Sequence, residues 1–382
     1  MKAIFLGAIR VTLELILEEE IRRLVGAYKW ERSGRADVRN GTYLRRLITS
    51  LGAVDLEVPR SRENGSAGSV IGRYKRRTEE LDDAIVAAYV NGVSTRKMGR
   101  ITEALMGEDV GRSTVSRVTK TLEEKVEELR RAPISEPMIY LYLDATFLDA
   151  RWARAVENVS VLVAYGIGPD GKRKLLAITI GAQESEESWA ELLRQLIDRG
   201  LHGVKLVIAD DHAGLRAAVR HALPEARQQR CVVHLTRNVF TKTPQRLRKR
   251  VAREVTRVFL APNIAQARER LEAFKNDFGK QLPEAVECLE SGFSAATQFY
   301  AFPKAHWRRI KTTNGVERLH AEIKRRTDAI GAFPDRASAL RLIIAIALTA
   351  TKTWADRRYL DMSVFEKNKP KEENETKNKA AA

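Results

Sequence analysis

The stretch MIYLYLDATFLDA, residues 138–150, carries an aspartate in the middle of a strongly apolar segment. Its isoleucine, leucine and tyrosine residues are typical of a buried β-strand. A carboxylate in such a strand is costly unless it is paired, hydrogen-bonded or bound to a cation. Asp144 is therefore either a capping or turn-forming residue at the end of the strand or part of a functional site.

The segments that follow predict a sheet built in two stages. ENVSVLVAYGI and KRKLLAITIGA are strand-like, and the turn GPDGK between them predicts that they pair antiparallel. A helix is then predicted over 185–201, a strand over 204–211, a helix over 212–224 and a strand over 227–235. The order β-β-β-α-β-α-β predicts an α/β fold in which α–β crossovers extend a hairpin meander. From residue 235 to about 306 the pattern is helical and basic, which interrupts the sheet.

Two further acids accompany Asp144. Asp210 stands in another apolar strand, LVIADD, and Glu317 lies in KTTNGVERLHAEIKRRT (311–327), a basic segment with the apolar spacing of a helix. Glu317 could simply complete a capping box with Asn314 as the N-cap. Three carboxylates that converge at a sheet edge would instead form a hard-oxygen site suited to Mg²⁺ or Mn²⁺. Two such ions about 3.5–4 Å apart can activate a nucleophile and stabilise a leaving oxygen in phosphoryl transfer.

Charge and composition narrow the class of partner. The chain has 382 residues, a formal net charge of +17 and two cysteines. Residues 236–330 hold 20 Lys and Arg against 10 Asp and Glu, so much of the excess charge lies in this part of the sequence. Such an excess indicates a polyanionic partner, without separating DNA, RNA and acidic membrane surfaces. The sparse cysteines, the lack of a long apolar run and the lack of an export signal predict a cytoplasmic protein without a membrane span.

Upstream of the strands, the sequence predicts three helices with the spacing of a helix-turn-helix. EELDDAIVAAYVNG and VSTRKMGRITEALMG are the first two, and the third begins in GRSTVSR with Ser113 and Thr114 as predicted caps. The same pattern is found in DNA-binding motifs and in plain three-helix bundles with a solvated basic face. In the first case the DNA-facing residues would be Arg112, Ser113, Thr114, Ser116, Arg117 and Lys120.

Several longer motifs recur in one known family. In the second half of the chain they are DATFLDAR, DDHAGLRAAV, QQRCVVHLTRNV, TTNGVERLHAEIKRRTDAIGAFPD and TKTWADRRYL. In the first half they are ADVRNGTYLRRLITSLGAVDLEVPRSREN and YVNGVSTRKMGRITEALMGEDVGRSTVSRVTKTLEE. The chain thereby resembles bacterial Mutator-type (MULE-like) insertion-sequence transposases over most of residues 35–360. The resemblance implies a DDE enzyme with an RNase H-like mixed sheet (β-β-β-α-β-α-β-α), an all-helical insertion and an α-helical N-terminal DNA-binding region.

The resemblance also assigns roles by position. Asp144, Asp210 and Glu317 match the three catalytic acids of the family, at separations of 66 and 107 residues, and would hold two Mg²⁺ or Mn²⁺ ions. The implied reaction is hydrolysis of a phosphodiester at terminal inverted repeats, followed by attack of the freed 3′-OH on target DNA. His234, in the pair Cys231-x-x-His234, would orient DNA or the scissile phosphate. The implied partners are double-stranded DNA, both terminal repeats and target, and further copies of the chain in a homodimer or higher oligomer.

Other residues keep two interpretations each. Asp211 adjoins Asp210, and only the family frame Asp-x-His-x-Gly-Leu selects the latter. Cys231 and His234 could form half of a zinc site, but no second pair of ligands is evident. Trp189 could stack on a flipped base, although core packing of its helix is the favoured role. The basic residues of the Glu317 helix could contact phosphates or form a solvated face: Arg318, Lys324, Arg325 and Arg326.

The patterns predict six regions and leave two rival functions open. The regions are a DNA-end-binding region (1–60), a helix-turn-helix domain (61–133), the first part of the catalytic core (134–235), a helical insertion (236–306), the Glu-bearing part of the core (307–362) and a disordered tail (363–382). One rival is a catalytically decayed helix-turn-helix regulator, which the intact acids argue against. The other is an RNase H-like nuclease without strand transfer, which the insertion and the N-terminal DNA reader argue against.

Overall fold

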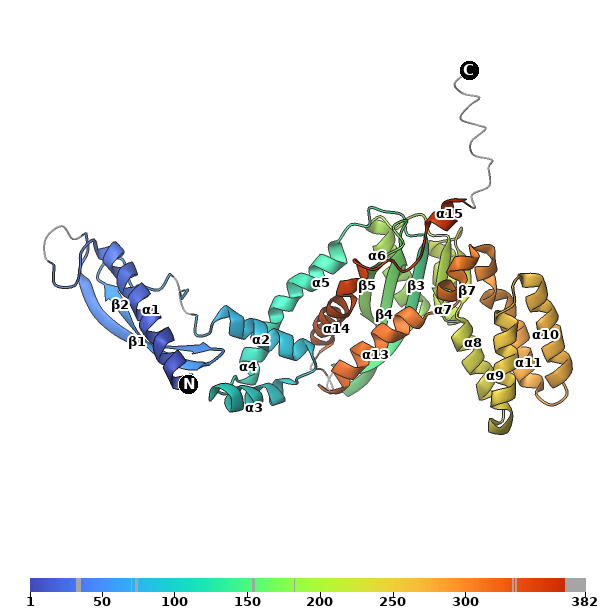
Figure 1. The fold of residues 1–382 in the computed structure, drawn as a ribbon, viewed down its shortest axis with the longest axis horizontal. Coiled ribbons are helices and arrows are strands. Elements are labelled where there is room, and N and C mark those ends of the chain that lie inside the picture. The colour runs from blue at the N-terminus through green and yellow to red at the C-terminus, as the bar shows by residue number, and fades with distance from the viewer. Residues whose placement is uncertain are drawn as a thin grey trace, which may run out of the picture. The chain divides into compact units, whose positions relative to one another are not determined.

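The computed structural model describes residues 1–31, 36–69, 71–72, 75–152, 155–181, 183–331, 333 and 335–367. The chain divides into two compact units, Met1–Leu122 with Asp328–Ile330, and Glu123–Thr327 with Gly331–Ala382. Figure 1 labels the helices and strands of both units. The finer division into six regions stays a prediction.

The first unit begins with a long helix on a two-stranded sheet. Helix α1 (Lys2–Val25) packs on the antiparallel hairpin of β1 (Arg39–Thr49) and β2 (Gly52–Ser61). The core between them is apolar because alternate residues of β2 face the helix: Leu17, Ile21, Val25, Val54, Leu56 and Val58 are all buried. The two strands turn at Ser50 and Leu51.

Three helices complete this unit. They are α2 (Glu79–Val90), α3 (Thr95–Met106) and α4 (Arg112–Val118), and each packs on the other two. The predicted third helix is interrupted, because a 3₁₀ turn (Thr119–Thr121) separates α4 from α5 (Leu122–Arg131). The predicted caps are also wrong: Gly111 is the N-cap, and Ser113 and Thr114 lie within the first turn.

The second unit is built on a five-stranded mixed sheet in the order β5-β4-β3-β6-β7. Its strands are β3 (Tyr140–Trp152), β4 (Ala155–Ile167), β5 (Arg173–Gly181), β6 (Leu206–Ala209) and β7 (Arg227–Arg230). The pairs β3–β4 and β4–β5 are antiparallel, whereas β6 runs parallel to β3 and β7 parallel to β6. The predicted α/β class and the predicted order of strands and helices are therefore confirmed. The bounds of the last predicted strand, 227–235, are wrong: β7 ends at Arg230, and α8 (Val232–Thr241) begins directly after Cys231, so His234 lies on a helix.

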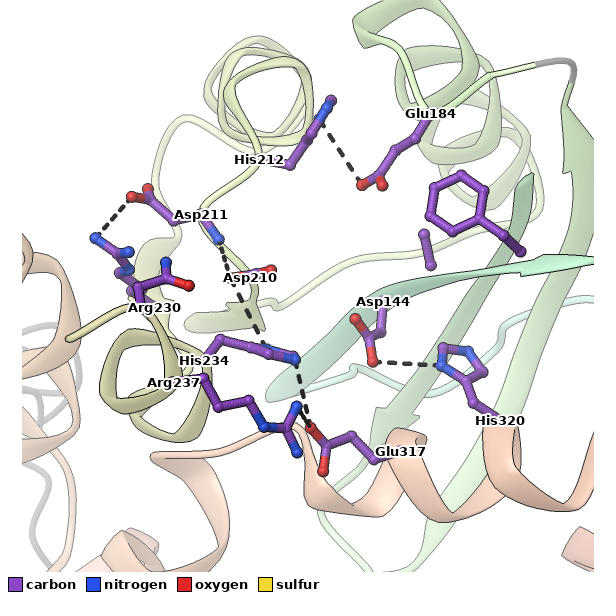
Figure 2. Close-up of a pocket in the computed structure, with 13 residues that line it drawn as sticks. Asp144, Glu184, Asp210, Asp211, His212, Arg230, His234, Arg237, Glu317 and His320 are labelled. Carbon is purple, nitrogen blue, oxygen red and sulfur yellow. Dashed lines mark hydrogen bonds and ion pairs between the residues drawn. The ribbon is translucent and has the colours of Figure 1, made fainter. Parts of the chain in front are cut away.

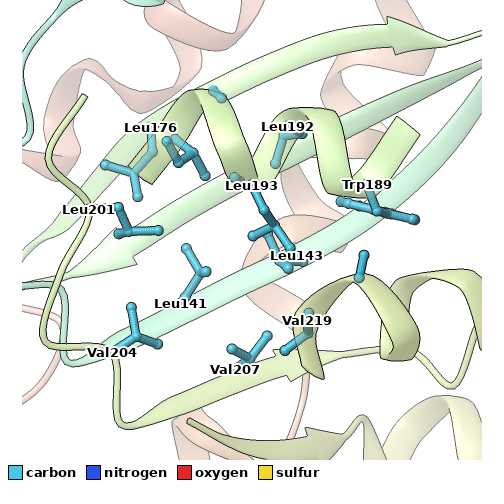
Figure 3. Packing of buried hydrophobic residues seen from close by; sticks show 14 of the residues in the cluster. Leu141, Leu143, Leu176, Trp189, Leu192, Leu193, Leu201, Val204, Val207 and Val219 are labelled. Carbon is cyan, nitrogen blue, oxygen red and sulfur yellow. The ribbon is translucent and has the colours of Figure 1, made fainter. Parts of the chain in front are cut away.

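The two faces of the sheet carry different layers. Leu141 and Leu143 of β3 face α6 (Glu186–Asp198) and α7 (Ala213–Ala222), where Trp189 is fully buried (Figure 3). Trp189 therefore packs in the core. Tyr140 and Tyr142 alternate with these leucines and point to the opposite face. Helix α14 (Arg336–Thr351) packs on β3 and β5.

The predicted helical insertion follows β7. It consists of α8 (Val232–Thr241), α9 (Gln245–Phe259), α10 (Ile264–Phe278) and α11 (Pro283–Ala296), and α11 packs against β7 and α8 (Figure 1). The chain returns to the sheet through two 3₁₀ turns (Gln298–Ala301 and Lys304–His306) and α12 (Trp307–Ile310). Helix α13 (Asn314–Asp328) then carries Glu317.

Two features lie near the end of the chain. Among the described residues, one segment, Arg336–Trp354, is long and apolar enough to cross a membrane, and it comprises α14 and the following 3₁₀ turn (Lys352–Trp354). Ala339, Leu342 and Ile343 of this segment are fully buried within the protein, as in a core helix. The tail predicted to be disordered from residue 363 instead begins with a short helix, α15 (Ser363–Lys367). The rest of that prediction lies outside the described residues.

Candidate active site

The pairing register of two central strands places the first two acids side by side. Tyr142 of β3 pairs with Ile208 of β6, and the strands are parallel. Two residues further along each strand, the same register sets Asp144 opposite Asp210, which directly follows β6. Neighbouring strands are about 4.8 Å apart and residues two apart share a face, so both carboxylates lie at the same edge of the sheet.

The acids nearest in sequence to Asp144 and Asp210 form ion pairs or hydrogen bonds with other residues. Asp211 forms ion pairs with Arg230 at 2.7 Å and Arg216 at 3.0 Å. Asp149, five residues after Asp144 on β3, accepts a hydrogen bond from the Asn158 side chain at 3.1 Å. Asp210, by contrast, has an oxygen 3.8 Å from the His234 ring. The family frame had selected Asp210 over Asp211 as the catalytic acid. The ion pairs are consistent with this assignment, because two arginines already hold Asp211.

Short links between α8 and the start of α13 bring Glu317 to this edge despite the insertion. The Val232 N–H donates to the Lys311 carbonyl at 3.0 Å. The Thr313 hydroxyl and N–H both lie 3.4 Å from the sulfur of Cys231, a buried free thiol at the N-cap of α8. Gly315 allows close contact with the sheet, because a Cβ there would come within 2.4 Å of the Tyr165 hydroxyl.

The capping-box interpretation of Glu317 is wrong. Helix α13 starts at Asn314, and the Glu317 N–H donates to the carbonyl of Thr313. The Glu317 side chain turns to α8 instead, where its Oε1 lies 3.3 Å from His234 Nε2 and 2.9 Å from Arg237 Nη1. These contacts hold the glutamate over the sheet edge that carries the two aspartates.

The three acids and His234 line one open pocket of about 600 Å³. Figure 2 shows Asp144 from β3, Asp210 after β6, His234 and Arg237 from α8, and Glu317 from α13 around it. The exposed fraction of the side chain rises from 9% for Asp144 to 27% for Glu317 and 44% for Asp210. Glu184, Asp211, His212, Arg230 and Asn238 are among the other lining residues.

His320 also belongs to this pocket, and sequence reasoning missed it. It lies one turn after Glu317 on α13, and its Nδ1 is 3.4 Å from Asp144 Oδ2. The ring is 8% exposed, and its Nε2 has no hydrogen-bond partner within the described part of the chain. The available signal was spacing, because residues three apart on a helix share a face.

Burial and neighbouring charges shift the pKa values of three residues in the pocket. Burial raises the pKa of Asp144 to about 7, and repulsion by the neighbouring acids adds to the effect of burial. The neighbouring Cys231 sulfur raises the pKa of His234 to about 9 despite burial, and the aspartates contribute. Burial, together with repulsion by His234, lowers the pKa of His320 to about 4. The surroundings therefore favour the cationic form of His234, the neutral form of His320 and the protonated form of Asp144.

The donors of the pocket fit a hard divalent cation. Asp144, Asp210 and Glu317 supply carboxylate oxygens, which Mg²⁺ and Mn²⁺ prefer. Within the described residues no three His, Cys, Asp or Glu groups already meet at one point. In the structure the Glu317 carboxylate pairs with His234 and Arg237. The Cys231 sulfur accepts hydrogen bonds from the N–H and the hydroxyl of Thr313.

The residues predicted to contact DNA fall into two groups. Those on α4 and in the following 3₁₀ turn are accessible, since Arg112, Ser113, Ser116, Arg117 and Lys120 are exposed and Thr114 is half-buried. On α13, Arg318 and Lys324 are exposed, and Arg325 is exposed but bound to Glu322. Arg326 differs from its prediction, because it is only 9% exposed and its guanidinium binds Glu322. A buried, paired guanidinium does not offer a free donor to a phosphate.

Comparison with known proteins identifies the family. The family model for "Transposase, Mutator family" matches residues 2–357. A transposase for insertion sequence element ISRM5 from Rhizobium meliloti is 35% identical over 94% of this chain and 91% of the relative. The transposase for IS256 in transposon Tn4001 from Staphylococcus aureus is 36% identical over 91% of this chain and 90% of the relative.

A solved structure of the Drosophila P element transposase strand transfer complex aligns with 78% of this chain and 86% of that chain. Its TM-score is 0.33 and its sequence identity 10%, too little for a comparison of sites. The family match, in contrast, extends over both compact units and includes every residue of the pocket. The chain therefore belongs to the Mutator family of transposases.

Proposed function

We propose that this transposase is a DDE enzyme whose catalytic acids are Asp144, Asp210 and Glu317. One observation carries the proposal: acids separated by 66 and 107 residues in the sequence line a single pocket at the edge of the central sheet. The mixed sheet, with an antiparallel meander followed by two parallel strands, supports an RNase H-like core.

The three carboxylates would hold two Mg²⁺ or Mn²⁺ ions. Such ions, when bound, activate a water or hydroxyl nucleophile and stabilise the leaving oxygen of a phosphodiester. Residues of the chain would position the acids and the DNA. His234 remains cationic next to Glu317 and can face a phosphate oxygen, and His320 orients the Asp144 carboxylate. Exposed lysines and arginines hold the DNA backbone without reading its sequence.

The substrate we propose is the terminal inverted repeats of an insertion sequence, because the relatives are transposases of such elements. In the first step water attacks phosphorus and the P–O3′ bond breaks, which leaves a 3′-OH and a 5′-phosphate. In the second step that 3′-oxygen attacks a target phosphodiester and displaces the target's own 3′-oxygen. Both steps exchange one P–O bond for another. The start of α4 would read the repeats, and a dimer or higher oligomer would hold the two ends.

The direct test is cleavage and joining of DNA that carries the repeats flanking the gene. Full-length protein, labelled duplex and Mg²⁺ should give nicked ends and strand-transfer products. Asp144→Ala and Glu317→Ala should abolish both. Asp149→Ala is the matched control, since it removes an acid from the same strand outside the pocket.

Three results would contradict the proposal. Cleavage that survives Asp144→Ala and Glu317→Ala would exclude these acids from the reaction. Nicked ends without joined products would identify a nuclease. DNA binding without Mg²⁺-dependent cleavage by the unaltered protein would identify a regulator.

A further inference from the structure

Arg237 binds the Glu317 carboxylate oxygen that a metal ion would need as a ligand. It lies one turn after His234 on α8, so both side chains reach the same Glu317 oxygen, at 2.9 Å for Arg237 Nη1 and 3.3 Å for His234 Nε2. The Arg237 side chain is 58% exposed and lines the mouth of the pocket (Figure 2). Two cationic groups of the chain thus hold one carboxylate oxygen of the proposed metal site.

This contact can exchange. A half-exposed ion pair stabilises a protein by at most about 1 kcal/mol, because water solvates both groups when they separate. A divalent cation that shares the Glu317 carboxylate would repel the guanidinium and compete for the same oxygen. The guanidinium would then lie free at the pocket mouth, on a side chain long enough to turn toward bound DNA.

Arg230, the other arginine in the pocket lining, cannot take this role. Its side chain is 10% exposed and its guanidinium is held by Asp211 at 2.7 Å. Among the described residues, the ion pair of Arg237 is the one with Glu317. An arginine also suits a phosphate well, since its planar donors can bind two phosphate oxygens at once. Asn238, next along α8, lines the same pocket and adds a further donor.

We propose that Arg237 neutralises Glu317 in the metal-free protein and moves to a phosphate oxygen of the DNA when a divalent cation takes the carboxylate. This inference rests on the proposed function of the pocket. It makes Arg237 a substrate-binding residue that competes with the metal before DNA arrives. Removing Arg237 should therefore raise the affinity for the metal and lower the affinity for DNA.

The experiment measures both affinities in the full-length protein. Mn²⁺ alone is titrated by calorimetry, and a duplex carrying the terminal repeat is titrated in the presence of Ca²⁺. Arg237→Ala should bind Mn²⁺ about two- to fivefold more tightly than the unaltered protein, because the competing guanidinium is gone. It should bind DNA several-fold more weakly, with the salt dependence of binding reduced by about one phosphate contact.

Arg194→Ala is the matched control. Arg194 is 65% exposed on α6 and pairs with Glu191 at 2.7 Å, so its removal deletes the same charge from a similar ion pair away from the pocket lining. It should leave Mn²⁺ affinity unchanged. Arg237→Lys should restore part of the DNA affinity, since it keeps the charge without the planar donors.

The outcomes separate this inference from the proposed function. Mn²⁺ binding that needs Asp144 but is unchanged or weaker in Arg237→Ala would overturn the exchange and leave the DDE proposal standing. Mn²⁺ binding that is absent from the unaltered protein, or that survives Asp144→Asn, would overturn both. Unchanged DNA affinity in Arg237→Ala would overturn the phosphate contact.

Discussion

Asp37 and Asp144 are both buried aspartates, 4% and 7% exposed, yet their surroundings are opposite. Asp37, just before β1, accepts hydrogen bonds from the Asn64 N–H at 2.9 Å, the Asn64 side chain at 3.0 Å and the Glu63 N–H at 3.2 Å. Although burial acts against it, these donors hold the pKa of Asp37 well below its usual range.

Asp144 faces two further carboxylates and two imidazoles, and burial raises its pKa to about 7. The two sites show that burial alone does not mark a functional acid. Asp37 has the donors that a carboxylate needs and ties the loop after β2 to the start of β1. Around Asp144 the net effect is the reverse, because burial and the neighbouring carboxylates outweigh the groups that favour its charged form.

The largest expected difference between variants of Asp144 and of Asp37 is in the rate of DNA cleavage. Asp144→Asn should lower Mg²⁺-dependent cleavage of terminal repeats by roughly 10³-fold, because losing a metal ligand forfeits several kcal/mol of transition-state stabilisation. Asp37→Asn, assayed at a temperature where it is folded, should retain cleavage within a few-fold. Equal losses in the two variants would erase the distinction between a structural and a catalytic acid.

The second contrast is the pH dependence of stability without metal. The pKa of Asp144 is raised from 3.8 to about 7, so its contribution to stability is present at pH 4 and is lost as the pH rises through 7. The lowered pKa of Asp37 works the other way: its contribution is present at neutral pH and is lost only in acid.

In EDTA at pH 8, Asp144→Asn should therefore raise the melting temperature and Asp37→Asn should lower it. At pH 4 the Asp144→Asn shift should nearly vanish, since the native aspartate is then protonated. Thermal melts from pH 4 to pH 8 measure both. A lower melting temperature for Asp144→Asn at pH 8 would show that its carboxylate is already compensated.

A smaller effect is expected at His320. Its ring lies beside Asp144, so we expect it to act as a positioning residue for that carboxylate. His320→Ala should reduce Mn²⁺ affinity and cleavage by about 10- to 100-fold, as for other partners of metal ligands. His320→Asn should recover part of both. His221→Ala, an exposed histidine on α7, should be silent, and an equal loss in His221→Ala would remove the case for His320.

The smallest effects are expected at the exposed start of α4. Arg112→Ala and Arg117→Ala should each weaken binding of the terminal repeat by a few-fold and reduce the slope of log affinity against log salt by about one. Arg131→Ala is the control, because that exposed arginine on α5 pairs with Glu127. Binding assays between about 50 and 200 mM salt give the slope. Identical slopes in all three variants would remove α4 from the DNA interface.

The sequence was most informative where apolar runs are long. Strands β3 to β6 follow from such runs, and the placement of Asp144 and Asp210 follows from the strands. Strand β7 is the polar segment Arg227–Arg230, and the apolar residues that suggested a longer strand there begin α8 instead. Glu317 needed the family resemblance, because 107 residues separate it from Asp210 and no local pattern measures that distance. The structure supplies the missing reason, a hydrogen bond from Val232 to Lys311 that closes the insertion.

Other features depend on contacts that no local pattern contains. Thr313 and Asn314 are both good N-cap residues, so the sequence alone does not show which of them precedes the helix. In the structure α13 starts at Asn314, and Thr313 is hydrogen-bonded to the Cys231 sulfur. Arg326 was indistinguishable from its neighbours until the packing of α13 buried it against Glu322. The burial and donors of Asp37 likewise arise from the hairpin, which brings Glu63 and Asn64 back beside it.

The most direct test of the central claim is anomalous diffraction from crystals of the full-length protein soaked in Mn²⁺. The account predicts a Mn²⁺ peak between the Asp144 and Asp210 carboxylates, with Glu317 turned from Arg237 toward the metal. Peaks that avoid Asp144, or a pocket without Mn²⁺ at concentrations that support cleavage, would contradict it.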